Sequence, residues 1–359
     1  MWLTDFLIGY LAALNFARLP KPSRGSTRAV RATVTEVWFE ANKTDNLPYP
    51  QCYFFDNATG QVTFDASIEL RDGFIVRRVD RWLSGKPHEN MRGWISGWMA
   101  NNPEDFNLDT EELTLTNGKL LLPATQSKKS STWVILVHGR TAKRAETYRA
   151  LQIFSDLGLS ALAVSLRNNF EASTARDRRS HFGFLEWQDV AAAVSHARKE
   201  GAENIIFYAI SMGAVSVAEC IRNSHETFAG VILDSPVVNW RETLEVMARK
   251  NQLTVAQQNK AVWFIESWLG SKLLRLKKPV QLRELGFANW CSNFELPILL
   301  MHSEDDGYVD YEPSQSFALA HQEFVKLETF DTALHVQLWN YQPERYRQLL
   351  SEFVAKLPI

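Results

Sequence analysis

Residues 204–215 read Asn-Ile-Ile-Phe-Tyr-Ala-Ile-Ser-Met-Gly-Ala-Val. The apolar run through Ile210 predicts a buried strand, and the residues from Met212 onward predict a helix that begins at once. Ser211 therefore stands on a sharp turn from strand to helix, the setting in which the motif G-x-S-x-G exposes a nucleophilic hydroxyl. Ala209 replaces the first glycine of that motif, which is a small change. From these residues alone, Ser211 is either a nucleophile or an ordinary helix N-cap.

Strand patterns alternate with helical patterns on both sides of this stretch, from about residue 110 to the C-terminus. Short apolar runs predict strands at 133–137, 161–165, 204–210, 231–233, 297–301 and 324–330. Amphipathic stretches predict helices at 141–157, 185–199, 212–222, 312–321 and 343–356. Such alternation is typical of a mainly parallel sheet with helices on both faces.

Acidic and imidazole side chains follow two later strands of this series. Asp305 and Asp306 come after the strand at 297–301, and His335 comes after the strand at 324–330. A carboxylate orients an imidazole, and the imidazole takes the proton of a serine as the serine attacks. The chain therefore predicts a triad of Ser211, His335 and one of the two neighbouring aspartates.

Residues from about 110 to 357 resemble the α/β-hydrolase superfamily, in particular the serine hydrolases close to prolyl oligopeptidase and the dienelactone hydrolase-like esterases. The matching stretches are VILVHGR at 134–140, SLRN at 165–168, EWQDV at 186–190, AISMGA at 209–214, LDSPVVNW at 233–240, LLMHSEDDGYV at 299–309 and the loop of His335. The resemblance implies the α/β-hydrolase fold and an acid four residues after His302, which is Asp306. It also implies that the backbone N–H groups of Arg140 and Met212 bind the oxyanion.

The chain is expected to divide into three parts. Residues 1–25 form an apolar helix and a linker, residues 26–109 a small β-rich module, and residues 110–359 the hydrolase domain. Residues from about 240 to 294 interrupt the strand–helix alternation, and in the resembling enzymes an insertion near this place forms a helical cap over the active site. Its aromatic side chains Trp263, Phe264 and Trp268 either face the substrate or form the core of the cap.

Composition restricts the partners. The chain of 359 residues holds 39 basic and 41 acidic residues, and this balance argues against nucleic acid as a partner. Three distant cysteines, Cys52, Cys220 and Cys291, predict no disulfide framework. Neither an HExxH metal motif nor a phosphate-binding glycine loop is present, so no metal or cofactor is expected.

Residues 1–17 form an apolar run that Asp5 interrupts, and the run is short for a membrane span. It is either a helix docked on the protein or a peripheral or anchored membrane contact. We expect a cytoplasmic location, with membrane association through residues 1–17 as the alternative.

These residues favour a serine hydrolase that cleaves an ester or thioester of a small-molecule acyl substrate through an acyl-enzyme. The alternatives are a peptidase or amidase of the prolyl oligopeptidase type, and a catalytically silent hydrolase fold that acts as a binding protein. The sequence predicts no particular oligomeric state.

Overall fold

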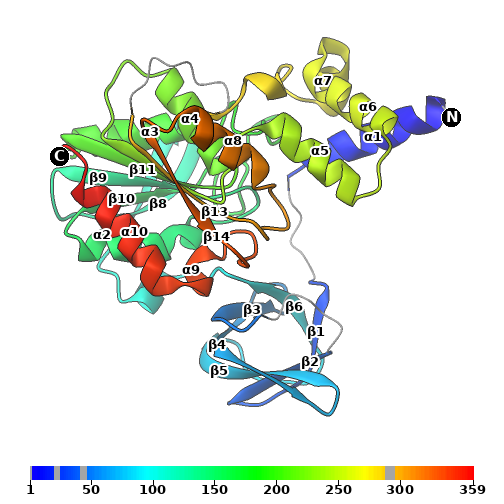
Figure 1. Cartoon of the computed structure of the whole chain (residues 1–359), viewed down its shortest axis with the longest axis vertical. Helices are drawn as coiled ribbons and strands as arrows, with labels where there is room; N and C mark the ends of the chain where they lie inside the picture. The colour runs from blue at the N-terminus through cyan, green and yellow to red at the C-terminus, as the bar shows by residue number, and fades with distance from the viewer. Residues whose placement is uncertain (1, 20–24, 41–46, 288–295) are drawn as a thin grey trace.

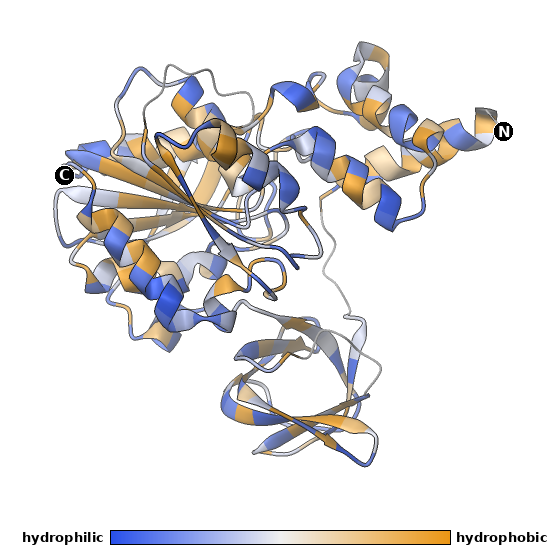
Figure 2. Ribbon diagram, in the orientation of Figure 1, coloured by the Kyte–Doolittle hydropathy of each residue, from blue (hydrophilic) through white to orange (hydrophobic). Residues whose placement is uncertain are grey.

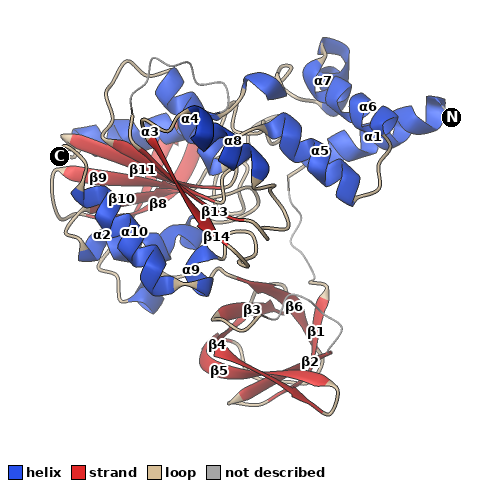
Figure 3. Cartoon of the chain, viewed as in Figure 1, coloured by secondary structure: helices blue, strands red, loops and turns tan. Residues whose placement is uncertain are grey.

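The computed structural model describes residues 2–19, 25–40, 47–287 and 296–359. The linker expected around residues 20–24, residues 288–294 of the expected insertion, and Cys291 lie outside the described residues. Figure 1 shows an open sheet between helices, a small barrel, and a group of helices that includes the N-terminus. The strands thus fall into two separate groups (Figure 3).

The larger group is an eight-stranded sheet in the order β14-β13-β12-β11-β9-β10-β8-β7. The strands from β14 to β10 are parallel, and β8 and β7 continue the sheet as antiparallel strands. Their bounds are β7 Glu111–Asn117, β8 Leu120–Ser127, β9 Thr132–Val137, β10 Ser160–Val164, β11 Asn204–Ile210, β12 Gly230–Asp234, β13 Ile298–Ser303 and β14 Val325–Phe330. Parallel strands put their carboxyl ends at one edge, where the candidate site lies.

Helices cover both faces of this sheet. Along β9, Trp133, Ile135 and Val137 enter one core, and Val134 and Leu136 enter the other. The first core is closed by α3 (Trp187–Lys199), α4 (Gly213–Arg222) and α8 (Glu312–Ala320). The second is closed by α2 (Tyr148–Asp156), α9 (Leu338–Tyr341) and α10 (Pro343–Ala355). The strands are accordingly apolar on both faces, as Figure 2 shows.

The smaller group is a closed antiparallel barrel in the order β1-β2-β5-β4-β3-β6. Its strands are β1 Thr27–Ala32, β2 Glu36–Glu40, β3 Gln51–Phe55, β4 Gly60–Arg71, β5 Phe74–Ser84 and β6 Met91–Ser96. Closure pairs every strand edge, and the interior is filled by a small apolar core that includes Phe39, Tyr53 and Phe64.

A buried polar network joins the segments beside barrel strands β3 and β6 to the helices α2 and α9 and to the loop of His335. The Arg149 guanidinium on α2 donates to the carbonyls of Gly97 and Val336 at 3.0 and 2.7 Å and to Asn340 Oδ1 at 3.0 Å. Asn340 Nδ2 in turn donates to the carbonyls of Pro50 and Gly97 at 2.9 and 3.0 Å. Because Val336 follows His335, the same network fixes the barrel and the histidine loop.

The insertion forms the helices α5 (Trp240–Lys250), α6 (Val255–Glu266) and α7 (Trp268–Leu274), and the N-terminal helix α1 (Trp2–Ala17) packs on α6 and α7. Phe264 is fully buried, and its ring centroid lies 4.9 Å from that of Phe6 and 5.2 Å from that of Tyr10. Among the described residues, no helix has the length and apolar character needed to cross a bilayer. Short 3₁₀ turns lie at Pro103–Phe106, Arg144–Thr147 and Leu282–Glu284.

Candidate active site

Ser211 lies on the turn between β11 and α4. Its φ of 51° is a left-handed conformation that residues other than glycine rarely adopt. Close packing explains the small neighbours, because a Cβ on Gly213 would lie 2.7 Å from the carbonyl oxygen of Val137 and 2.8 Å from that of His138. Such strain at a strand-to-helix turn is the geometry that exposes a nucleophilic serine.

His335 stands between Ser211 and Asp306. Its Nε2 lies 3.0 Å from Ser211 Oγ, and its Nδ1 lies 2.7 Å from Asp306 Oδ2. With the proton on Nδ1, the imidazole donates to the carboxylate and accepts from the hydroxyl. The structure therefore brings the three residues chosen from the sequence into one hydrogen-bonded series.

The two aspartates of the acid loop differ in their surroundings. Asp306 is buried, and its Oδ1 accepts hydrogen bonds from the backbone N–H groups of Tyr308 and Val309 at 3.0 and 2.6 Å. Its Oδ2 also lies 3.4 Å from His302 Nε2. Asp305 is exposed, and its backbone N–H donates to Ser303 Oγ at 3.2 Å. The carboxylate beside the imidazole is thus that of Asp306.

Electrostatics couple the acid and the imidazole. Burial alone would raise the pKa of Asp306, but the charge of His335 and the contacts with the His302 and His335 side chains outweigh it and hold that pKa well below its ordinary value. Burial alone would lower the pKa of His335, but the charge and the hydrogen bond of Asp306 outweigh it and raise that pKa. The pair therefore favours an imidazolium, the form that exists while a serine attacks.

The two expected oxyanion donors flank Ser211. Arg140 follows β9 and Gly139, and Met212 is the N-cap of α4. Within the described part of the chain, no group accepts a hydrogen bond from the backbone N–H of either residue. The assignment of these two N–H groups as oxyanion donors stays a prediction. The Arg140 side chain is used elsewhere, since its guanidinium donates to the carbonyl of Phe16 at 2.8 Å.

Glu146 is a site residue that the sequence reasoning missed. Its Oε2 accepts from the backbone N–H of Gly139 at 3.2 Å, which braces the loop that carries Arg140. Burial raises the pKa of Glu146. Its neighbours Lys143, Arg144 and Thr147 are polar, so no local signal sets this glutamate apart from a surface residue.

A pocket of about 720 Å³ opens at Ser211 and His335. Aromatic side chains form much of its lining, namely Phe54, Trp94, Trp98, Phe170 and Tyr308. The first three come from the barrel or the segment just after it, and the rings of Phe54 and Trp94 stack with their centroids 5.3 Å apart. The β-rich module therefore supplies one wall of the pocket.

The expectation that the insertion at 240–294 covers the active site is corrected here. Among the described residues, none that lines the pocket belongs to the insertion. The reason is that α6 and α7 pack on α1 instead, so Phe264 and Trp263 contact Phe6. Sequence patterns indicated the helices but not the surface on which they would pack.

Comparisons of the sequence with known proteins find only distant similarity. No family model matches the chain. A Bacillus subtilis protein is 23% identical over 232 residues, which are 62% of this chain and 71% of that protein.

Solved structures with the same fold include an esterase of Pyrococcus furiosus, which is 20% identical with a TM-score of 0.55 over 72% of this chain and 95% of that one. The esterase Est1E of Butyrivibrio proteoclasticus, solved with ferulic acid, is 17% identical with a TM-score of 0.53 over 68% of this chain and 100% of that one. A proline iminopeptidase-related protein of Thermus thermophilus is 17% identical with a TM-score of 0.53 over 69% and 98% of the two chains. The chain therefore has the α/β-hydrolase fold that the sequence resemblance predicted.

Proposed function

We propose that this protein is a serine hydrolase that cleaves esters or thioesters through an acyl-enzyme. Ser211 is the nucleophile, His335 the general base and acid, and Asp306 the group that orients the imidazole. The observation that carries the proposal is the series from Ser211 Oγ to His335 Nε2 at 3.0 Å and from His335 Nδ1 to Asp306 Oδ2 at 2.7 Å. It is supported by a fold shared with solved esterases.

The chemistry follows from these contacts. Ser211 Oγ attacks the acyl carbon while its proton passes to His335 Nε2, and the carbonyl oxygen becomes an oxyanion held by the N–H groups of Arg140 and Met212. The imidazolium then gives its proton to the departing alcohol or thiol, which leaves an acyl group on Ser211. Water, deprotonated by the same imidazole, attacks the acyl carbon, and the proton returns to Ser211 as the acid is released.

The pocket suggests the class of acyl group. Its aromatic wall of Phe54, Trp94 and Trp98 faces the same space as Ser211, and such a surface favours an apolar acyl or aryl group over a charged one. We therefore propose a small-molecule ester or thioester whose acyl part is apolar.

The test is hydrolysis of p-nitrophenyl esters of increasing acyl length, with a matched p-nitroanilide, by the wild-type protein and by Ser211→Ala. We expect the wild-type protein to hydrolyse the esters. Ser211→Ala should reduce this turnover by on the order of 10⁴-fold or more, because the substitution removes the nucleophile and almost no packing. Preferential cleavage of the anilide would replace the esterase assignment with that of an amidase. Equal ester turnover by the two proteins would contradict the role of Ser211.

A further inference from the structure

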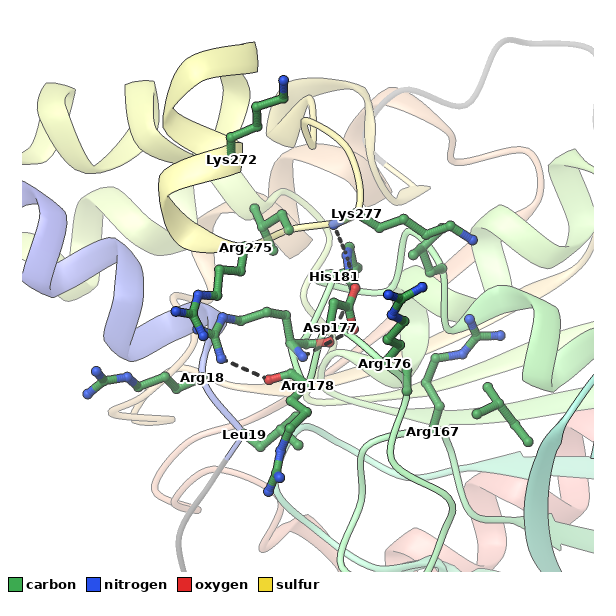
Figure 4. Close-up of a pocket in the computed structure, with 15 residues that line it drawn as sticks. Arg18, Leu19, Arg167, Arg176, Asp177, Arg178, His181, Lys272, Arg275 and Lys277 are labelled. Atoms are coloured by element: carbon green, nitrogen blue, oxygen red, sulfur yellow. Dashed lines mark hydrogen bonds and ion pairs between the residues drawn. The ribbon is translucent and has the colours of Figure 1, made fainter.

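A second and larger cavity, of about 1140 Å³, lies apart from the pocket at Ser211. It is bounded by the end of α1, the loop at 175–179 that follows β10, and the segment from α7 to Lys277 (Figure 4). The two cavities share no lining residue among those described. A much smaller cavity lies between them, and it shares Leu19 and Arg167 with the large cavity and Gly139 and Arg140 with the Ser211 pocket. The large cavity therefore lies behind the oxyanion loop, away from the nucleophile.

The lining of this cavity is strongly cationic. The basic side chains that line it and form no ion pair with any described residue are Arg18, Arg176, Arg178, Arg179, Lys272, Arg275 and Lys277. Asp177 is the one acid among the described lining residues, and its Oδ2 lies 3.1 Å from His181 Nε2. Arg167 also lines the cavity, but it is neutralised by Asp189 through Nη2–Oδ1 and Nε–Oδ2 contacts of 2.7 and 2.9 Å. The positive charge of the lining thus exceeds the negative charge of the acidic side chains around it.

The cluster is held in place by contacts between its three segments. Arg18 and Arg179 form an isolated antiparallel bridge, and the Ser180 backbone N–H donates to the carbonyl of Ala17 at 2.9 Å. Arg179 Nε donates to the carbonyl of Leu274 at 2.7 Å. Burial lowers the pKa of Arg179, and the nearby charges of Arg18 and Arg275 lower it further. Like charges are therefore fixed close together, an arrangement that an anion would stabilise.

Backbone conformation adds an independent observation. Arg178 and Arg275 both have positive φ values, 54° and 61°. Arg275 is the C-cap of α7, a position where left-handed backbone is common and glycine is the residue that adopts it without strain. An arginine at this position costs backbone stability, and it places a guanidinium at the cavity. Lys272 is the outlying member of the cluster, since its ammonium lies 3.5 Å from the centroid of the Trp268 ring.

We propose that this cavity binds a molecule that carries two or more phosphate charges. Guanidinium groups match phosphate oxygens in pairs, and several of them around one cavity suit several charges on one ligand. The volume exceeds that of a single phosphate ion and is in the range of drug-sized ligands. The ligand is either a soluble polyphosphate compound or the headgroup of an anionic lipid, which present the same chemistry.

The test is calorimetric titration of the full chain with tripolyphosphate at constant ionic strength, with sodium chloride as the control for unspecific anion effects. The variant Arg176→Gln/Arg178→Gln/Arg275→Gln removes three cavity cations. Its matched control, Lys86→Gln/Lys119→Gln/Lys199→Gln, removes three exposed cations elsewhere. We expect the cavity variant to bind at least about tenfold more weakly, the loss of about one charge-assisted hydrogen bond, and the control to bind like the wild type. Equal affinity of the two variants, or no binding by the wild type, would speak against a soluble ligand.

Cosedimentation with vesicles distinguishes the lipid source. Vesicles of phosphatidylcholine with cardiolipin, an anionic lipid with two phosphate groups, are compared with vesicles of phosphatidylcholine alone. If the wild type and the control variant bind the acidic vesicles and the cavity variant does not, the ligand is a lipid headgroup. If the protein binds tripolyphosphate but not the vesicles, the ligand is a soluble compound. If neither probe binds in a way that depends on the cavity arginines, the proposal is overturned. Unchanged ester turnover by the cavity variant shows that this variant is folded. If the triple variant does not fold, the single variant Arg176→Gln replaces it, and we expect a smaller loss of binding.

Discussion

Asp305 and Asp306 are adjacent, yet only one of them can support His335. Asp306 Oδ2 lies 2.7 Å from the imidazole, and Asp305 is exposed. We expect Asp306→Asn to lower kcat by on the order of 10⁴-fold, because the amide fixes the wrong tautomer and no longer stabilises the imidazolium. Asp305→Asn is the matched control and should change kcat only slightly. Ester hydrolysis by the two variants gives the answer, and equal or reversed effects would refute the assignment of the acid.

The protonation state of His335 should also determine how the activity depends on pH. Its pKa is raised by Asp306, and only the neutral imidazole accepts the proton of Ser211. Activity should therefore be lost as the pH falls through a value above the ordinary histidine pKa of about 6.5. Removing the carboxylate charge should move this acidic limb of kcat/KM to lower pH in Asp306→Asn. An acidic limb in the wild type below the ordinary value, or one that Asp306→Asn leaves in place, would be inconsistent with this coupling.

Among the elements, α1 and α6 depend on one another. Phe264 on α6 is fully buried against Phe6 and Tyr10 of α1, and truncation of such a side chain typically costs about 3–5 kcal/mol. We expect Phe264→Ala to release α1, which faster hydrogen exchange of residues 3–17 would report. Trp263→Ala, at a side chain that is 38% exposed, is the milder control.

The same variant tests where the insertion acts. Because Phe264 does not line the pocket at Ser211, the preference for acyl length should be the same in Phe264→Ala as in the wild type. A changed preference would show that the insertion, and not only the barrel, reaches the substrate.

The local elements of the sheet and the order of the site residues could be predicted from the sequence. Strand and helix periodicity places Ser211, Asp306 and His335 each after a strand, namely β11, β13 and β14, and parallel strands bring those positions to one edge. The pocket wall could not be predicted in this way. Phe54 and Trp94 become cross-strand partners only when the barrel closes, and that contact joins residues far apart in the chain.

The barrel is expected to set specificity. Trp98 lines the pocket and its ring centroid lies 5.2 Å from that of Phe54, so Trp98→Ala should enlarge the acyl space. We expect the ratio of kcat/KM for long over short acyl esters to rise by about tenfold. Trp38→Ala is the control, because Trp38 is a barrel tryptophan that contacts the Arg31 and Arg71 guanidinium groups and does not line the pocket. An unchanged ratio in Trp98→Ala would exclude this part of the barrel as a specificity wall.

The central claim is that Ser211 is the nucleophile of a serine hydrolase, and covalent labelling tests it most directly. The protein is treated with a fluorophosphonate, which reacts preferentially with activated serine hydroxyls, and the modified residue is located by peptide mass spectrometry. We predict one adduct, on Ser211, that is absent from folded Ser211→Ala. An adduct on another residue, or undiminished labelling of Ser211→Ala, would contradict the claim.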